Sequence, residues 1–301
     1  MSELDPNGPV VVALGGGHGL AAALRAIRRY ASSVTAIVSV ADDGGSSGRL
    51  RRDLGVLPPG DLRRCLVALS DDELWANAFE YRFAAGDLDG HALGNLMLVG
   101  LTDMTGDFTA ALDAAGRLLN AVGRVLPATT EPVVLKAEIG NVEAPGHEVE
   151  GQVAVQNSTD IRRVDLVPAD AGASAEAVQA IDQADQVVLA PGSLYTSLLP
   201  VLCVDALRGA VAGTGGRVVQ LANLHPQPPE TTGLDATDHL RAVLAHGVRV
   251  DAFLYQQAGE LAADVEQIRE WGVEPVAANI ATDRGSTHDP RRLALALQAL
   301  L

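Results

Sequence analysis

The feature that most constrains the fold is a run of glycines between a short apolar segment and a helical one. Residues 9–14 (PVVVAL) are continuously apolar, as in a strand that is buried on both faces, and they end at Gly15, Gly16 and Gly17. Leu20, Leu24 and Ile27 then recur at helical spacing, and residues 34–40 (VTAIVSV) form a second β-branched run. A strand, a glycine loop, a helix and a strand in this order predict a parallel α/β domain.

The same order of elements returns in the second half of the chain. We expect strands at residues 186–190, 217–221 and 251–255, each followed by a polar loop and a helical stretch. The sequence therefore predicts an α/β fold with a Rossmann-like, doubly wound and mostly parallel sheet.

A helical and β-hairpin elaboration is expected in the middle of the chain. Residues 72–121 are rich in alanine and leucine and predict helices, whereas residues 125–155 predict β-structure. The short strand-like runs there include 133–135 and 153–155, bounded by turns at Gly140-Asn141 and Pro145-Gly146. Since there is no long linker, we expect a single domain over 1–301, with the β-rich elaboration at about 124–165.

Charge and composition exclude several functions. The 38 acidic and 22 basic side chains give a net charge of -16, which disfavours nucleic acid and anionic membranes as partners. Lys136 is the only lysine, which argues against a Schiff-base or P-loop mechanism. Cys65 and Cys203 lie too far apart for metal-type spacing, and neither a signal peptide nor a run of ~20 apolar residues is found. We therefore expect a cytoplasmic protein with no membrane insertion.

The first glycine loop, residues 15–19 (GGGHG), predicts a phosphate or nucleotide site. Glycines let the backbone approach a ligand, and the following helix offers free N–H groups to an anion. The dinucleotide fingerprint G-x-G-x-x-G is incomplete because its third glycine falls on Leu20, and no G-K-[ST] follows. A tight turn without a ligand is the alternative.

The second loop, residues 41–53 (ADDGGSSGRLRRD), combines paired carboxylates with glycine, serine and arginine. Asp42 and Asp43 suit a hard cation or a ribose, and the Gly/Ser run suits an anion. Five arginines lie within sixteen residues, which predicts a cationic cluster for an anionic ligand; they are Arg49, Arg51, Arg52, Arg63 and Arg64. The alternative is a solvated helix face in which they pair with Asp53 and Asp61.

Three further segments carry candidate site residues. His91 and Asn95 are four residues apart, so we expect them on one helix face with Gly94 allowing close approach. Asp61 follows Pro58-Pro59-Gly60 and is either a helix N-cap or a ligand contact. Residues 190–197 (APGSLYTS) end a buried strand and predict a second anion site, where Tyr195 could stack on a base. No G-x-S-x-G elbow or cysteine nucleophile motif supports acyl transfer.

Together, these loops resemble one family over nearly the whole chain. Residues 15–19, 40–50, 58–61, 91–96 (HALGNL) and 191–197 (PGSLYTS) are similar to motifs of the YvcK-type gluconeogenesis factors. These belong to a superfamily shared with CofD, the 2-phospho-L-lactate transferase of coenzyme F420 synthesis. The continuation over residues 49–58 (RLRRDLGVLP) favours the YvcK branch.

The resemblance implies a cytoplasmic Rossmann-like protein that binds a UDP-sugar, chiefly UDP-N-acetylglucosamine, and supports cell-wall (peptidoglycan) synthesis, cell shape and growth on gluconeogenic carbon sources. We also expect a homodimer, interaction with cell-wall synthesis proteins, and a Mg²⁺ site at Asp42 and Asp43. The expected ligand-binding residues are Gly15, Gly16, Gly17, His18, Gly19, Asp42, Asp43, Gly44, Gly45, Ser46, Ser47, Arg49, Arg52, His91, Asn95, Pro191, Gly192, Ser193, Tyr195, Thr196 and Asn223.

The chain departs from the family pattern at three places. His18 replaces the usual threonine of the first loop, and His225-Pro226 alters the loop over residues 223–231. Thr287 stands where an arginine precedes His-Asp, so a sugar-phosphate contact by that arginine is lost or passes to Arg284.

Three functions are compatible with these residues to different degrees. A nucleotide-sugar-binding regulator without turnover fits best, since no complete catalytic constellation is visible. A Mg²⁺-dependent transferase of the CofD type, moving a phospholactyl-type group from a nucleotide diphosphate donor to an acceptor, is the alternative. An NAD-dependent dehydrogenase is disfavoured by the missing third glycine.

Overall fold

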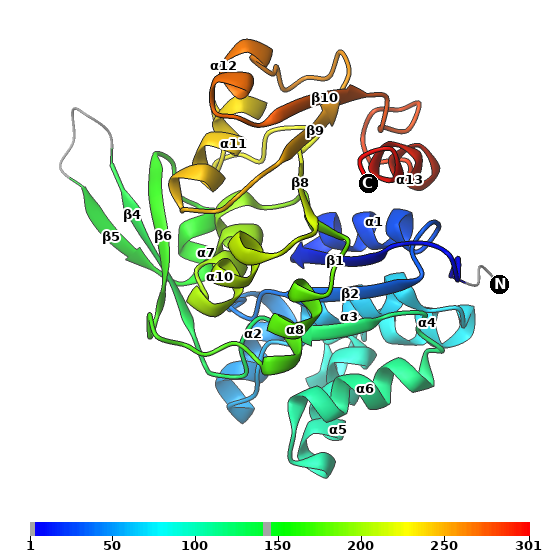
Figure 1. The fold of residues 1–301 in the computed structure, drawn as a ribbon. Coiled ribbons are helices and arrows are strands. Elements are labelled where there is room, and N and C mark those ends of the chain that lie inside the picture. The colour runs from blue at the N-terminus through cyan, green and yellow to red at the C-terminus, as the bar shows by residue number, and fades with distance from the viewer. Residues whose placement is uncertain (1–3, 141–145) are drawn as a thin grey trace.

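A seven-stranded parallel sheet forms the centre of the computed structural model, which describes residues 4–140 and 146–301. Its strand order is β10-β9-β8-β7-β1-β2-β3, and every neighbouring pair is parallel (Figure 1). The strands are β1 (Val10–Gly15), β2 (Ser33–Val38), β3 (Arg124–Pro127), β7 (Gln186–Leu189), β8 (Arg217–Leu221), β9 (Ala252–Gln256) and β10 (Glu274–Ala278). The predicted Rossmann-like α/β fold is confirmed.

The sheet has a topological switch point between β1 and β7. From β1 the chain adds β2 and β3 on one side, and it later returns to add β7, β8, β9 and β10 on the other side. At such a point the loops after the two central strands diverge and leave a crevice at the carboxyl edge of the sheet. The glycine loop after β1 and the serine loop after β7 therefore border the same crevice.

A second, three-stranded antiparallel sheet lies to one side of the main sheet (Figure 1). It consists of β5 (His147–Glu150), β4 (Val134–Ile139) and β6 (Ile161–Val167) in that spatial order. The expected elaboration began at residue 124, but β3 pairs with β2 in the main sheet, so the β-rich part begins at β4. The predicted turns at Gly140-Asn141 and Pro145-Gly146 involve residues outside the described ranges.

Helices cover the main sheet, and five of them, α2 to α6, lie between β2 and β3 in the sequence. The α-helices are α1 (Gly17–Ile27), α2 (Gly45–Leu54), α3 (Gly60–Leu69), α4 (Glu73–Glu80), α5 (Leu93–Thr105), α6 (Phe108–Leu118), α7 (Gln152–Gln156), α8 (Ala175–Asp182), α9 (Leu199–Leu202), α10 (Asp205–Gly213), α11 (Ala236–Ala245), α12 (Val265–Glu270) and α13 (Pro290–Gln298). Two short segments are the 3₁₀-helix η1 (Gly86–Leu88) and the π-helix η2 (Leu194–Leu198). Helix α1 packs against α3 and α13, and α8 packs against α10.

Residues 153–155 are helical, so their predicted β-structure is wrong. They lie in α7, which starts directly after Gly151. The carboxylate of Asp43 accepts hydrogen bonds from the backbone N–H groups of Gln152 (2.9 Å) and Val153 (3.0 Å). A distant side chain thus caps the first turn of this helix, and the local valine-rich sequence gives no sign of it.

Among the described residues, no single helix is long and apolar enough to cross a membrane. One bent pair, 194–202 with 205–213, meets that test by length and composition alone, with a bend of 76°.

Candidate functional site

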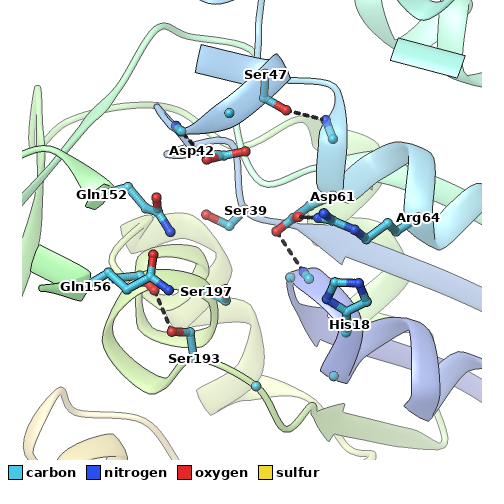
Figure 2. A pocket seen from close by; sticks show the side chains of 18 of the residues that line it. His18, Ser39, Asp42, Ser47, Asp61, Arg64, Gln152, Gln156, Ser193 and Ser197 are labelled. Atoms are coloured by element: carbon cyan, nitrogen blue, oxygen red, sulfur yellow. Dashed lines mark hydrogen bonds and ion pairs between the residues drawn. The ribbon is translucent and has the colours of Figure 1, made fainter. Parts of the chain in front are cut away.

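A cavity of about 590 Å³ lies at the switch point, within the size range of small-molecule sites. The loops after β1, β2 and β7 line it, and so do the start of α3 and one face of α7 (Figure 2). The predicted site residues on its wall are Gly16, Gly17, His18, Gly19, Asp42, Gly44, Gly45, Ser46, Ser47, Asn95, Gly192, Ser193 and Thr196. The structure therefore brings most of the predicted loops to one place.

The glycine loop after β1 carries α1 into the cavity wall. Helix α1 begins at Gly17, whose φ of +61° is left-handed and favours glycine. A Cβ atom on Gly19 would lie 1.9 Å from the carbonyl oxygen of Pro191, so only glycine lets α1 approach the loop after β7. His18 faces the cavity, where burial and then Arg64 lower the pKa of its imidazole. It is therefore a neutral hydrogen-bonding group at pH 7.

Asp61 does not cap its own helix. It lies in the first turn of α3, but its Oδ2 accepts a hydrogen bond from the N–H of Gly17 at 2.7 Å, and its Oδ1 pairs with Arg64 at 2.6 Å. The N-cap interpretation is therefore wrong for α3, because the carboxylate satisfies an amide at the start of α1 instead. Both Asp61 and Arg64 line the cavity.

The loop after β2 carries α2 to the opposite wall. Asp42 lines the cavity, and its Oδ1 accepts a hydrogen bond from the N–H of Gly44 at 3.0 Å. Burial raises the pKa of the Asp42 carboxyl, and neighbouring Asp61 raises it further. Ser47 accepts a hydrogen bond from the N–H of Gly60 at 3.0 Å, which ties α2 to α3. The first turn of α2 thus presents backbone amides and two serines to the cavity.

Asp43 lies outside the cavity lining because its carboxylate caps α7. The expected pairing of Asp42 and Asp43 around a cation is therefore not formed. In the described parts of the chain, no group of three or more His, Cys, Asp or Glu side chains is arranged to hold a metal ion. Asp42 has a different acidic neighbour on the cavity wall, which is Asp61.

A buried polar network supports the start of α2. The Ser46 hydroxyl accepts a hydrogen bond from Asn95 Nδ2 at 3.0 Å and lies 3.0 Å from His91 Nδ1. Asn95 Oδ1 in turn accepts from Arg63 Nε at 3.0 Å, and Arg63 pairs with Glu80 at 2.6 Å. His91 precedes α5, so the prediction that His91 and Asn95 share one helix face is wrong. The two side chains nevertheless meet at Ser46.

The arginines do not form the predicted cluster of five. Arg49 donates to the carbonyl oxygen of Asp89 at 2.7 Å, and Arg51 donates to that of Val133 at 2.5 Å. Arg52 is exposed, and all three lie outside the cavity lining. Only Arg63 and Arg64 reach the wall, where they are joined by Arg82. Which arginine side chains of α2 and α3 face the cavity depends on how each helix is rotated about its axis. The number of arginines in the sequence does not determine that rotation.

The loop after β7 carries its own carboxylate. Glu230, which is 3% exposed, accepts hydrogen bonds from the Ser193 hydroxyl and from the N–H groups of Tyr195 (2.7 Å) and Thr196 (3.3 Å). This occupies the amides that were predicted to bind a ligand anion. Burial raises the pKa of Glu230.

Four other predicted site residues support the wall from behind. Tyr195 is 5% exposed and packs in the core, where it is not available to stack on a base. Asn223 exchanges hydrogen bonds with the backbone of Gly192, at 2.7 and 2.8 Å, and so fixes that loop. Gly15 and Pro191 also lie outside the lining.

Several lining residues were missed by sequence reasoning. Gln152 and Gln156 come from α7, most of which falls in the segment 125–155 predicted as β-structure, and Glu230 and Gln227 come from the irregular loop after β8. The remaining missed residues are Ser39, Gly60, Arg82, Val153 and Pro228, whereas Ser197 belongs to the segment 190–197 that was predicted as an anion site. A helical interpretation of residues 152–156 would have placed both glutamines on one face, four residues apart.

A second cavity of about 470 Å³ lies beyond the loop after β8. His225 lines it and bridges Glu260 (2.6 Å) and the carbonyl oxygen of Gly285 (2.8 Å). Arg284, the candidate replacement for the arginine absent at Thr287, is exposed and lies outside the linings of both cavities.

Comparison with known proteins identifies the family. The family model described as "2-phospho-L-lactate transferase CofD" matches residues 11–289. The gluconeogenesis factor of Bacillus subtilis (strain 168) is 38% identical over 97% of this chain and 98% of its own length. The chain belongs to the CofD family, in the branch of the YvcK-type gluconeogenesis factors.

Further similar proteins agree with this assignment. The gluconeogenesis factor of Halalkalibacterium halodurans is 44% identical over 78% of this chain and 73% of its own length. A crystal structure of a UPF0052 family protein from Bacillus halodurans superimposes with a TM-score of 0.91 at 36% identity, covering 97% of this chain and 99% of that one. The match to the CofD family model spans every residue that lines the cavity at the switch point.

Proposed function

We propose that the chain binds a nucleotide-diphosphate sugar of the UDP-N-acetylglucosamine type in the cavity at the switch point, and that it acts as a regulator without turnover. In this role it would support cell-wall synthesis, cell shape and growth on gluconeogenic carbon sources, as a homodimer that contacts cell-wall synthesis proteins. The names of the relatives support the link to gluconeogenesis.

One observation carries the ligand class. The first turn of α2, with Ser46 and Ser47, lines the same cavity as Arg63, Arg64 and Arg82. Helix N-terminal amides and arginines together favour a phosphate, and a volume of about 590 Å³ leaves room for more than a phosphate alone. A diphosphate with two organic ends suits this arrangement.

The carboxylates on the same wall favour a cation beside the diphosphate. Asp42 and Asp61 both face the cavity and raise the cost of placing a diphosphate there. Mg²⁺ typically binds one or two carboxylates together with phosphate oxygens. Asp42 and Asp61, in place of Asp43, would hold the ion, which would neutralise phosphate charge.

The same pair of carboxylates favours a second candidate function, a CofD-type transferase that moves a phospholactyl-type group from a nucleotide diphosphate donor to an acceptor. A metal at Asp42 and Asp61 beside a diphosphate is the arrangement that phosphoryl chemistry uses. Incubation with nucleotide-activated phospholactate and a deazaflavin acceptor tests it. Product formation would replace the regulator proposal, and the absence of product from folded protein counts against the transferase.

Isothermal titration calorimetry with UDP-N-acetylglucosamine, with and without Mg²⁺, tests the ligand. We expect millimolar or tighter binding that Arg64→Ala weakens about tenfold, since a charge-assisted hydrogen bond is worth about 1.5–3 kcal/mol. Arg52→Ala is the matched control because Arg52 lies outside the cavity. No binding of any UDP-sugar, or equal losses in both variants, would contradict the proposal.

A further inference from the structure

The cavity has two chemically different ends. Figure 2 shows His18, Asp61 and Arg64 on one side and Gln152 and Gln156 on the other, with Ser39 between them. The Arg64 guanidinium, which can neutralise a phosphate, is at the first end. The second end offers amides and hydroxyls, so a ligand that spans the cavity places its phosphates and a neutral group at opposite ends.

A second anion is excluded from the glutamine end by the chain itself. Glu230 occupies the amides of Tyr195 and Thr196 and the Ser193 hydroxyl, which are the donors that an anion would otherwise use there. A phosphate at this end would also face the Glu230 carboxyl, which lines the cavity. The groups at this end therefore favour an uncharged partner.

Gln152 and Gln156 are placed to recognise such a group. They lie four residues apart on α7, hence on one helix face, and Figure 2 shows both amides pointing into the cavity. Within the described residues, no hydrogen bond involves either side-chain amide; Gln152 is half-buried and Gln156 is exposed. Each amide thus keeps both a donor and an acceptor for a ligand.

Two contacts hold α7 with the glutamine face toward the cavity. Val155 is fully buried, and the Asp43 carboxylate accepts hydrogen bonds from the N–H groups of Gln152 and Val153. The two adjacent aspartates of the loop after β2 therefore divide their roles. Asp42 faces the ligand cavity, and Asp43 positions the helix that carries the glutamines.

From this geometry we infer that Gln152 and Gln156 determine ligand specificity by hydrogen bonding to an amide group of the bound nucleotide sugar, and that Asp43 is the positioning residue for both. The inference rests on the proposed function. Two parts of the ligand carry such chemistry, which are the N-acetyl group of the sugar and the imide of the uracil base.

Calorimetry with UDP-N-acetylglucosamine, UDP-glucose, UDP and CDP tests it on the wild type and on Gln152→Ala/Gln156→Ala. Alanine keeps α7 helical, and Gln179→Ala, on α8 outside the cavity, is the matched control. One neutral hydrogen bond is worth about three- to tenfold in Kd, so the double variant should lose about tenfold to a hundredfold while the control is unchanged.

The four ligands distinguish the outcomes. A loss for UDP-N-acetylglucosamine alone assigns the glutamines to the N-acetyl group, and an equal loss for all three uridine ligands, with lost preference over CDP, assigns them to uracil. If the wild type binds and the double variant keeps the same affinities, the inference is wrong while the proposed function stands. If the wild type binds none of the ligands, the proposed function itself fails.

Asp43 gives an independent test. Asp43→Ala should change the same affinity ratio as the double glutamine variant, either UDP-N-acetylglucosamine to UDP-glucose or UDP to CDP. It should do so although Asp43 does not line the cavity. Asp43→Asn keeps one acceptor for the α7 amides and should restore most of the wild-type ratio. Asp43→Ala with an unchanged ratio would overturn its positioning role, and equal thermal midpoints of the variants would exclude unfolding as the cause.

Discussion

Replacing Glu230 by alanine should strongly destabilise the turn that forms one wall of the cavity. The carboxylate accepts hydrogen bonds from the Ser193 hydroxyl and from the N–H groups of Tyr195 and Thr196. An unsatisfied buried donor costs about 1–3 kcal/mol, and water in the cavity offsets part of this. We expect Glu230→Ala to lower the free energy of unfolding by about 2–4 kcal/mol, and Glu230→Gln, which keeps one acceptor, by about 1 kcal/mol.

Urea unfolding followed by circular dichroism measures both changes. The pH dependence gives a second readout, because burial raises the pKa of Glu230 above its ordinary value of 4.5. The folded state then binds a proton more tightly than the unfolded state, so wild-type stability falls as pH rises from 4.5 through the raised pKa. Glu230→Gln should lack this component. A Glu230→Ala protein within about 0.5 kcal/mol of wild type would refute the claim that Glu230 holds this turn.

Three further perturbations test other parts of the structure. Arg63→Met removes a guanidinium that is 1% exposed and should lower the free energy of unfolding in urea by about 2–4 kcal/mol. Glu80→Gln changes its partner, which is 46% exposed, and should lower it by less than about 1 kcal/mol. Equal losses in the two variants would contradict the buried network. Gly94→Ala places a Cβ 2.7 Å from an aromatic ring and should lower stability by about 1–3 kcal/mol, and an unchanged thermal midpoint would show that the packing there is looser. The hydrogen bond to Glu260 raises the pKa of His225, so this exposed pair should contribute up to about 1 kcal/mol of stability below pH 6.5. That contribution should be lost as pH rises through the raised pKa. His225→Gln should remove this pH dependence of stability, and a His225→Gln protein with the wild-type pH profile would contradict the prediction.

The strand-end loops were predictable because their chemistry is local. The apolar run before Gly15 and the β-branched run before Asp42 each specify a buried parallel strand. In a parallel sheet the carboxyl ends of such strands share one edge. Sequence alone therefore located the cavity and most of the residues that line it.

The features that the sequence did not predict depend on contacts between residues far apart in the chain. Glu230 caps a turn 34 to 37 residues away, and Asp43 caps α7 from 109 residues away. The valine-rich segment at 152–156 therefore favours a strand by local preference and becomes a helix through a tertiary cap. Arg49 and Arg52 were misplaced for a similar reason, since the rotation of α2 about its axis is set by packing and not by charge.

A crystal structure of the protein with UDP-N-acetylglucosamine and Mg²⁺ tests the central claim most directly. We expect the diphosphate beside Arg64 and the first turn of α2, with an amide group of the ligand within hydrogen-bonding distance of Gln152 or Gln156. A ligand bound instead in the cavity beside His225, or phosphates placed against Gln156 and Glu230, would contradict this account.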